Sequence, residues 1–413
     1  MLDIEVANVD PLRMRAAGKG ALSLALMDAR NHTLRWVTAF EKALGGADLR
    51  LPLAVQGVPG VNPLRWTIGH LGWFQEFWIA RNLQRERGQH CDATPPRLAS
   101  ILTDADLFFD PASTPATRRW QLALPELQSV RQYLFETLET TLELLDGTPD
   151  TDDALYFYRL ALFREDCHGE ALAVLAQEVG FDSGLLPKLT APVASPPLYF
   201  PATRWQLGMS HGGFVFDNEK GAHEVSIPPF EIDAQPVSWA QYCEFVEDGG
   251  YDNASHWSAQ GWSWVQAQAQ ARRTPRHVDQ MRQGVLQRRF GRLDRVPMTQ
   301  PAVHVSWFEA DAWCRWAGRR LPAEVEWEAA AHQGATRGFR WGDVWEWTAS
   351  TLRPYPGFEA GPTREFSIPA IGAHKVMRGA SFATRGRLRS AKFRNFENPG
   401  YDNGFVGFRS CLP

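Results

Sequence analysis

The sequence lacks any run of basic residues. Its 43 Lys plus Arg stand against 47 Asp plus Glu, which gives a formal net charge of −4. A nucleic-acid-binding surface needs a concentration of positive charge, and no such footprint is present. The composition therefore argues against a nucleic-acid partner and favours a small neutral or zwitterionic substrate.

Cysteine and long apolar runs are also scarce. The five cysteines are scattered along the chain, and no two of them form a CxxC motif. Neither a disulfide framework nor a redox motif is therefore expected. The longest early apolar run, residues 21–27, ends at Asp28. It is too short for a membrane span, and its surroundings do not fit a signal peptide. We therefore expect a cytoplasmic protein without a membrane partner.

What is present is enough chain for two domains, each with its own core. Apolar residues recur at helical spacing over residues 22–44, 63–87, 124–145 and 153–179, a pattern typical of a four-helix bundle. Five prolines between residues 187 and 201 preclude a regular helix there. We place the boundary near residue 195, which predicts domains at 1–194 and 195–413.

The second half has a different pattern. Short strands are predicted at residues 214–216, 224–227 and 230–232, and helices at 238–247, 306–317 and 323–331. Seventeen tryptophans are present, and flat aromatic side chains can stabilise coil with little regular hydrogen bonding. We therefore expect an α+β domain with much coil, so that the fold class is α followed by α+β.

Several motifs carry a family resemblance that covers nearly the whole chain. Three segments of the second half, RLPAEVEWEAAA (320–331), GDVWEWT (342–348) and the glycine-rich stretch 376–409, resemble the formylglycine-generating-enzyme (sulfatase-modifying-factor) domain. Three segments of the first half, NHTLRW (31–36), NPLRWTIGHLGWFQEFWIARN (62–82) and LYFYRLALFREDCHGEAL (155–172), resemble the DinB-like helical domain. Together they are most similar to the selenoneine and ergothioneine synthase branch of that superfamily.

The resemblance implies an activity. It indicates an oxygen-dependent non-haem Fe(II) enzyme that joins selenium, donated by a selenosugar, to the imidazole C2 of hercynine. The bundle would bind the metal and the second domain the substrate, with the site where the two meet. Two alternatives remain. One is an ergothioneine-type sulfoxide synthase using a thiol donor, and the other is a metal-free binding homologue. The oligomeric state is not predicted. Formylglycine-generating enzymes use a cysteine pair near the C-terminus, and only Cys411 stands in that region.

The family's iron ligands are three histidines, one on the second helix and two in an HxxxHxE motif on the fourth. His70 matches the first, and His168 with Glu170 matches the end of the motif. The position four residues before His168 is Arg164, and a guanidinium has no lone pair to offer a metal. Either the site has been rebuilt around Arg164, which would pair with Glu165 or Glu170 and fix one carboxylate oxygen toward the metal, or it is empty.

A third donor could come from several side chains, and spacing does not choose between them. The candidates in the same segment are Glu165, Asp166 and Glu170, and His32 lies on the first helix. Glu170 stands about 200° around the helix from His168, so Glu165 is less badly placed. Cys167 is a weaker candidate because it points about 100° away from His168. The bland interpretation is that both histidines are interior polar residues of a bundle.

The substrate residues implied by the resemblance follow Phe393. Asn395 can bond the betaine carboxylate or imidazole, and Phe396 can attract the trimethylammonium through its ring face. Glu397 is the acidic residue that helps to hold substrate, and Arg394 and Tyr401 complete the predicted set.

Two departures from the ergothioneine synthases concern the chalcogen donor. Pro399, Gly400 and Tyr401 stand where a basic residue would bind the carboxylates of γ-glutamylcysteine. In the loop that carries a proton-donating tyrosine, this chain has Phe366, which has no hydroxyl. Both losses suit a donor without carboxylates, such as a neutral selenosugar. They suit a decayed enzyme equally well.

Overall fold

The computed structural model describes residues 10–46, 48–92, 94–210, 212–268, 272–281, 284–364 and 367–413. The chain divides into two compact units, each described by itself below. The first unit consists of Met1–Leu185 with two short later segments, Gly212–Val215 and Arg385–Leu388. The second consists of Leu186–His211, Phe216–Thr384 and Arg389–Pro413. The first unit is therefore not continuous in sequence.

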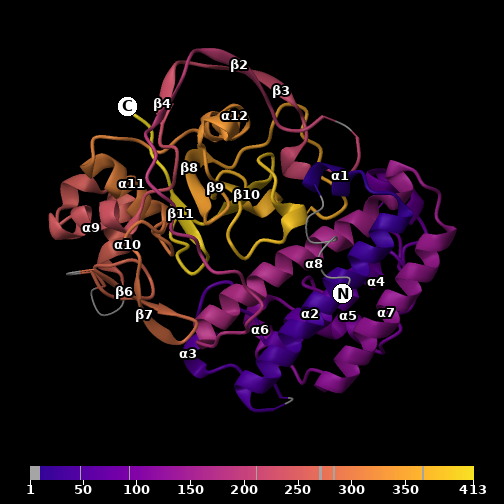
Figure 1. Cartoon of the computed structure of the whole chain (residues 1–413). Coiled ribbons are helices and arrows are strands. Elements are labelled where there is room, and N and C mark those ends of the chain that lie inside the picture. The colour runs from indigo at the N-terminus through magenta and orange to yellow at the C-terminus, as the bar shows by residue number, and fades with distance from the viewer. Residues whose placement is uncertain are drawn as a thin grey trace. The chain divides into compact units, whose positions relative to one another are not determined.

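Four long helices form the first unit, as the apolar periodicity predicts. They are α2 (Lys19–Leu44), α4 (Leu64–Trp78), α7 (Leu127–Gly147) and α8 (Asp152–Val179). Helices α2 and α4 each pack against both α7 and α8, which closes a four-helix bundle (Figure 1). The shorter helices are α1 (Pro11–Arg15), α3 (Leu53–Gln56), η2 (Arg85–His90), α5 (Ala105–Phe109) and α6 (Ala116–Arg119).

Local sequence signals set the ends of these helices. The Thr151 side chain accepts from the backbone N–H of Ala154 and caps α8, whose first turn is acidic. Both α2 and α8 end at a glycine in the left-handed region, Gly45 (φ 75°) and Gly180 (φ 87°). The prediction of a second helix over residues 63–87 is wrong at its far end, because α4 stops at Trp78 and the chain turns before η2.

The second unit is an α+β fold with small sheets. Its largest sheet has the strand order β10-β9-β8-β11, in which β8 and β11 are parallel and the other neighbours antiparallel. Its strands are β8 (Trp345–Thr351), β9 (Lys375–Gly379), β10 (Arg394–Glu397) and β11 (Val406–Phe408). Helix α12 (Glu324–Gln333) packs against β8 and β9 (Figure 1). Strand β10 of this sheet carries all of the predicted substrate residues except Tyr401.

The other elements of the second unit are short. Two-stranded sheets join β1 (Leu198–Phe200) to β4 (Phe230–Ile232) and β2 (Thr203–Leu207) to β3 (His223–Ile227). A three-stranded meander contains β5 (Val278–Gln280), β6 (Val285–Arg289) and β7 (Arg292–Val296). The remaining α-helices are α9 (Trp239–Glu247), α10 (Ala259–Gln266) and α11 (Trp307–Trp316). The strand predicted at residues 214–216 is wrong, because that segment has no strand pairing.

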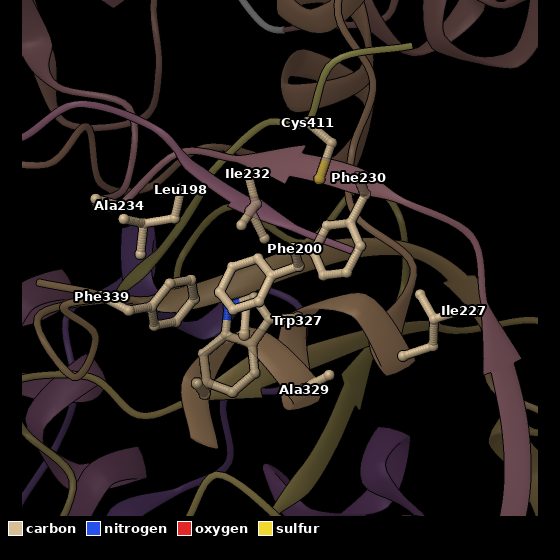
Figure 2. Close-up of a cluster of buried hydrophobic side chains, with 12 residues drawn as sticks. Leu198, Phe200, Ile227, Phe230, Ile232, Ala234, Trp327, Ala329, Phe339 and Cys411 are labelled. Atoms are coloured by element: carbon tan, nitrogen blue, oxygen red, sulfur yellow. The ribbon is translucent and has the colours of Figure 1, made fainter. Parts of the chain in front are cut away.

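Cys411 is part of the hydrophobic core of the second unit. Its side chain is fully buried in a cluster that contains Phe200, Phe230, Ile232 and Trp327 (Figure 2). Burial is the largest cause that raises the pKa of the Cys411 thiol. A buried, protonated thiol packs as a small hydrophobe and is not a nucleophile or a metal ligand.

Within the described residues, no helix is both long enough and apolar enough to cross a membrane.

Candidate functional site: a histidine pair in the helical unit

His70 on α4 and His168 on α8 face each other inside the first unit. Their ring centroids lie 5.9 Å apart, with the planes at 45°. The Nδ1 atom of His70 lies 2.9 Å from the carbonyl oxygen of Phe109, and that of His168 lies 2.9 Å from the carbonyl oxygen of Arg164. A carbonyl only accepts, so Nδ1–H must donate in both rings. Each Nε2 then keeps its lone pair, the form in which histidine binds a metal.

Both imidazoles are neutral at pH 7. Burial, followed by the charge of Arg164, lowers the pKa of His168 to about 3. Burial also holds the pKa of His70 well below its usual range, with smaller contributions from His168 and Arg164. The lone pairs are therefore not lost to protons, and the Arg164 cation acts on both rings.

Aromatic rings hold His70 from two sides. Trp66, one turn earlier on α4, stacks on it with centroids 4.9 Å apart and planes at 7°, and Trp73 stacks at 5.5 Å and 22°. The guanidinium carbon of Arg119 lies 3.6 Å from the centroid of the Trp66 ring. Such stacking restricts rotation of the imidazole, so His70 is held in one orientation.

Two of the three carboxylates predicted as a third donor are engaged by arginines. Glu165 is buried and accepts from Arg30 Nε at 2.9 Å and from Thr33 Oγ1 at 2.8 Å. Asp166 accepts from Arg387 Nε at 2.5 Å and Nη2 at 2.8 Å. In this structure neither carboxylate is presented to the histidine pair.

The other predicted donors do not complete a metal site either. His32 accepts the indole N–H of Trp36 on its Nε2 at 3.0 Å. Glu170 and Cys167 are partly buried on α8. Arg164 keeps the position of the missing histidine, with its guanidinium carbon 5.6 Å from the ring centroid of Phe74. In the part of the chain that the structure describes, no group of three His, Cys, Asp or Glu side chains could hold a metal ion. The histidine pair fits two positions of a metal centre, and these side chains do not supply a third.

The predicted substrate residues of strand β10 lie on two opposite faces of the strand. Successive side chains of a strand point to opposite faces, so Asn395 and Glu397 share one face and Phe396 lies on the other. On its own face Phe396 packs, partly buried, against the cluster of Leu352, Ala370 and Val376. Alternation along the strand thus directs Phe396 away from the face of Asn395 and Glu397.

Asn395 and Glu397 are both partly buried. The Asn395 Oδ1 atom accepts a hydrogen bond from the backbone N–H of Phe396 at 2.9 Å. This bond uses the oxygen of the side-chain amide and not its N–H₂ group. Burial raises the pKa of Glu397, and the N–H of Asn398, which donates to Glu397 Oε2 at 3.1 Å, partly offsets this. A carboxylate that is partly desolvated gains more from a cationic ligand than an exposed one does.

Arg394 is held by protein acceptors. Its Nε and Nη2 donate to the two oxygens of Glu324 at 2.8 and 2.9 Å, and its Nη1 donates to the carbonyls of Asn218 and Arg353 at 3.0 and 2.9 Å. This bidentate pair fixes the start of β10, so Arg394 orients Asn395 from within the fold. Tyr401 is partly buried and follows a turn closed by its own N–H to the carbonyl of Asn398 at 2.9 Å. Phe366 lies outside the described residues.

Two residues of the first unit, one bonded to His70 and one bonded to Asp166 near His168, had no sequence signal. Phe109 acts through its backbone carbonyl, which side-chain identity does not reveal. Arg387 lies in a glycine-rich stretch and binds Asp166 and Asp28 in the first unit. Only their placement in space assigns them to this unit.

The fold and the site define a class: a two-domain protein that joins a helical bundle containing paired neutral histidines to an α+β domain. Comparison with known families agrees. Residues 21–180 match the DinB superfamily, and residues 201–343 and 340–412 match the sulfatase-modifying factor enzyme 1-like domain. The chain belongs to the hercynine oxygenase family.

Individual relatives support this membership over nearly full length. The chain is 31% identical to a hercynine oxygenase of Mycolicibacterium smegmatis, covering 92% of this chain and 96% of the relative. It is 30% identical to a hercynine oxygenase of Mycobacterium tuberculosis, covering 94% and 97%. A formylglycine-generating enzyme of Streptomyces coelicolor is 27% identical over 51% of this chain and 86% of its own length.

Proposed function

We propose that this chain is an oxygen-dependent enzyme that acts on hercynine and joins selenium, from a neutral selenosugar, to the imidazole C2. The support for hercynine is the near-full-length similarity to two proteins named hercynine oxygenase. One observation carries the proposal of catalysis: His70 and His168 both present Nε2 lone pairs from rings 5.9 Å apart.

In this proposal His70 and His168 hold ferrous iron through Nε2, because imidazole is a suitable donor for iron. When bound, the ion would supply the activation of oxygen. The carbonyls of Phe109 and Arg164 keep Nδ1 protonated and so keep the donor atoms on the correct side of each ring. Water, oxygen or substrate would fill the remaining positions.

The substrate is held, in this proposal, by the face of β10 that carries Asn395 and Glu397. The Asn395 amide N–H₂ donates to the betaine carboxylate, and the Glu397 carboxylate balances the trimethylammonium. Arg394, through its bond to Glu324, keeps the strand in register for both. Lack of a cation at Pro399, Gly400 and Tyr401 favours a donor without carboxylates, and so favours a selenosugar over γ-glutamylcysteine.

A metal-free binding protein is the second candidate, favoured by one specific observation. Arg164 occupies the third ligand position, and the described residues offer no cluster of three donors. Such a protein would bind hercynine without turning it over.

Metal content and turnover test the proposal together. Protein purified anaerobically with ferrous iron is expected to hold close to one iron per chain. His70→Ala and His168→Ala should each abolish it, and the exposed His90→Ala serves as the matched control. With iron loaded, the protein should consume oxygen when given hercynine and a selenosugar. Oxygen consumption with hercynine and γ-glutamylcysteine, but not with hercynine and a selenosugar, would assign the thiol alternative. Hercynine binding in a protein that never takes up iron would assign the binding homologue.

A further inference from the structure

Three side chains on one face of α4 form hydrogen bonds to one short segment of the chain, residues 106–114. Trp66, His70 and Trp73 stand four and three residues apart and therefore project from one side of the helix. The Trp73 indole donates to Asp106 Oδ1 at 2.6 Å, His70 Nδ1 to the Phe109 carbonyl at 2.9 Å, and the Trp66 indole to Thr114 Oγ1 at 3.3 Å. We call Asp106, Phe109 and Thr114 the α5 clamp.

The clamp is itself fixed. Both oxygens of Asp106 accept from Arg81, at 2.7 and 2.8 Å. The Thr114 hydroxyl donates to the carbonyl of Asp110 at 2.7 Å. Asp106 and Thr114 are therefore each held by a bond to a residue outside α4.

One glycine lets the clamp approach. A Cβ added at Gly69 would lie 2.2 Å from ring atoms of Phe109. Separations of 2.2 Å are impossible for carbon atoms, so any side chain at Gly69 displaces Phe109. Because Phe109 also supplies the carbonyl that His70 bonds, the missing side chain at Gly69 determines the state of His70.

We infer that the α5 clamp is the positioning element of this site, which sets the tautomer and ring orientation of His70 so that Nε2 faces His168. Gly69 makes the clamp possible, and Trp66 and Trp73 hold the ring between them. The effect on metal binding rests on the proposed function. The tautomer of His70 does not, and it can be read in metal-free protein.

The test is the protonation of the His70 ring nitrogens, measured by long-range ¹H–¹⁵N correlation in the metal-free protein and assigned by difference with His70→Gln. The wild type should show Nδ1–H, and Gly69→Ala should lose it in favour of Nε2–H or a mixture. Gly20→Ala is the matched control, because a Cβ there meets nothing within 4 Å. His168 should keep its Nδ1–H tautomer in both variants, because its Nδ1 bonds the carbonyl of Arg164 on its own helix, and this tautomer acts as an internal reference.

Cobalt(II) gives the second measurement. Its absorption on titration should report an affinity about 10–100-fold weaker in Gly69→Ala and unchanged in Gly20→Ala, the usual cost of losing an outer hydrogen-bond partner. An Nε2–H tautomer in the wild type overturns the inference, even if Gly69→Ala fails to fold. Retention of Nδ1–H in a folded Gly69→Ala overturns it as well. A wild type that binds no cobalt would sink the proposed function, and the nitrogen spectrum would still decide the inference.

Discussion

Asp166 and Arg387, 221 positions apart in sequence, form a bidentate ion pair inside the first unit, with N–O distances of 2.5 and 2.8 Å. Both side chains are almost wholly buried. The third guanidinium nitrogen, Nη1, donates to Asp28 on α2 at 2.7 Å. One arginine thus joins α2 to α8, two positions from His168.

Removal of this arginine should destabilise the protein strongly. Arg387→Ala leaves the carboxylate of Asp166 buried without its partner, and we expect a loss of about 3–5 kcal/mol in the free energy of unfolding. Arg204→Ala, which breaks an exposed pair with Glu224, should cost no more than about 1 kcal/mol. Urea unfolding of both variants checks this. Equal effects in the two would show that the buried pair adds nothing beyond a surface pair.

Arg164 should oppose metal binding at the histidine pair, since its positive charge already lowers the pKa of both rings. Arg164→Ala is therefore expected to tighten cobalt(II) binding. Arg164→His should tighten it further by adding a donor, by about tenfold or more, where tenfold corresponds to about 1.4 kcal/mol. The exposed Arg50→Ala is the control. Weaker binding in Arg164→Ala would instead indicate that Arg164 supports the site through a carboxylate partner.

Stability should fall on acidification because of the neutral histidines. Burial, followed by the charge of Arg385, lowers the pKa of His32 to about 4. The unfolded chain takes up this proton near pH 6.5 and the folded chain only near pH 4, so the stability present above pH 6.5 is lost as the pH falls toward 4.

Between these pH values the free energy of unfolding should change by up to about 1.4 kcal/mol per pH unit for each such group. His32→Gln removes one contribution, so its stability should depend less steeply on pH than that of the wild type. Denaturant unfolding of the metal-free proteins at pH 7 and pH 5 measures both slopes. Parallel slopes would mean that His32 protonates alike in the folded and unfolded chains.

The two faces of β10 should separate binding from stability. Asn395→Ala should weaken hercynine binding by about 0.5–1.5 kcal/mol, the net value of one hydrogen bond, with little effect on unfolding. Phe396→Ala should mainly lower stability, by less than the ~3–5 kcal/mol of a fully buried Phe→Ala change, because its ring is partly buried against Leu352, Ala370 and Val376. Calorimetry with hercynine and histidine decides the point. If the wild type binds hercynine more tightly than histidine and Phe396→Ala binds both equally, then Phe396 has the cation–π role that the sequence predicts.

The sequence predicts the bundle well because apolar spacing and caps are local. The ends of α8, for example, follow from Thr151 and Gly180. It predicts the end of α4 poorly because Ile79 and Leu83 continue the apolar pattern past the turn. Strands β9 to β11 are missed because they are only three to five residues long, too short for a periodic pattern, and they are recognisable only by their partners.

The histidine pair could be found from sequence, but its surroundings could not. His70 and His168 stand out by residue type and motif. Glu165 looked available as a donor, and only the fold shows it bound to Arg30, 135 positions earlier. Long-range pairing of this kind carries no local pattern. The faces of Asn395 and Phe396, by contrast, follow from simple alternation once the strand is known.

The position of Arg387 also has a consequence for the order of events during synthesis. When α8 leaves the ribosome, Asp166 has no counter-charge, and the arginine that supplies it is translated 221 residues later. Until then the carboxylate must stay hydrated or protonated. The bundle around the histidine pair therefore reaches its final packing only after most of the second domain has been made.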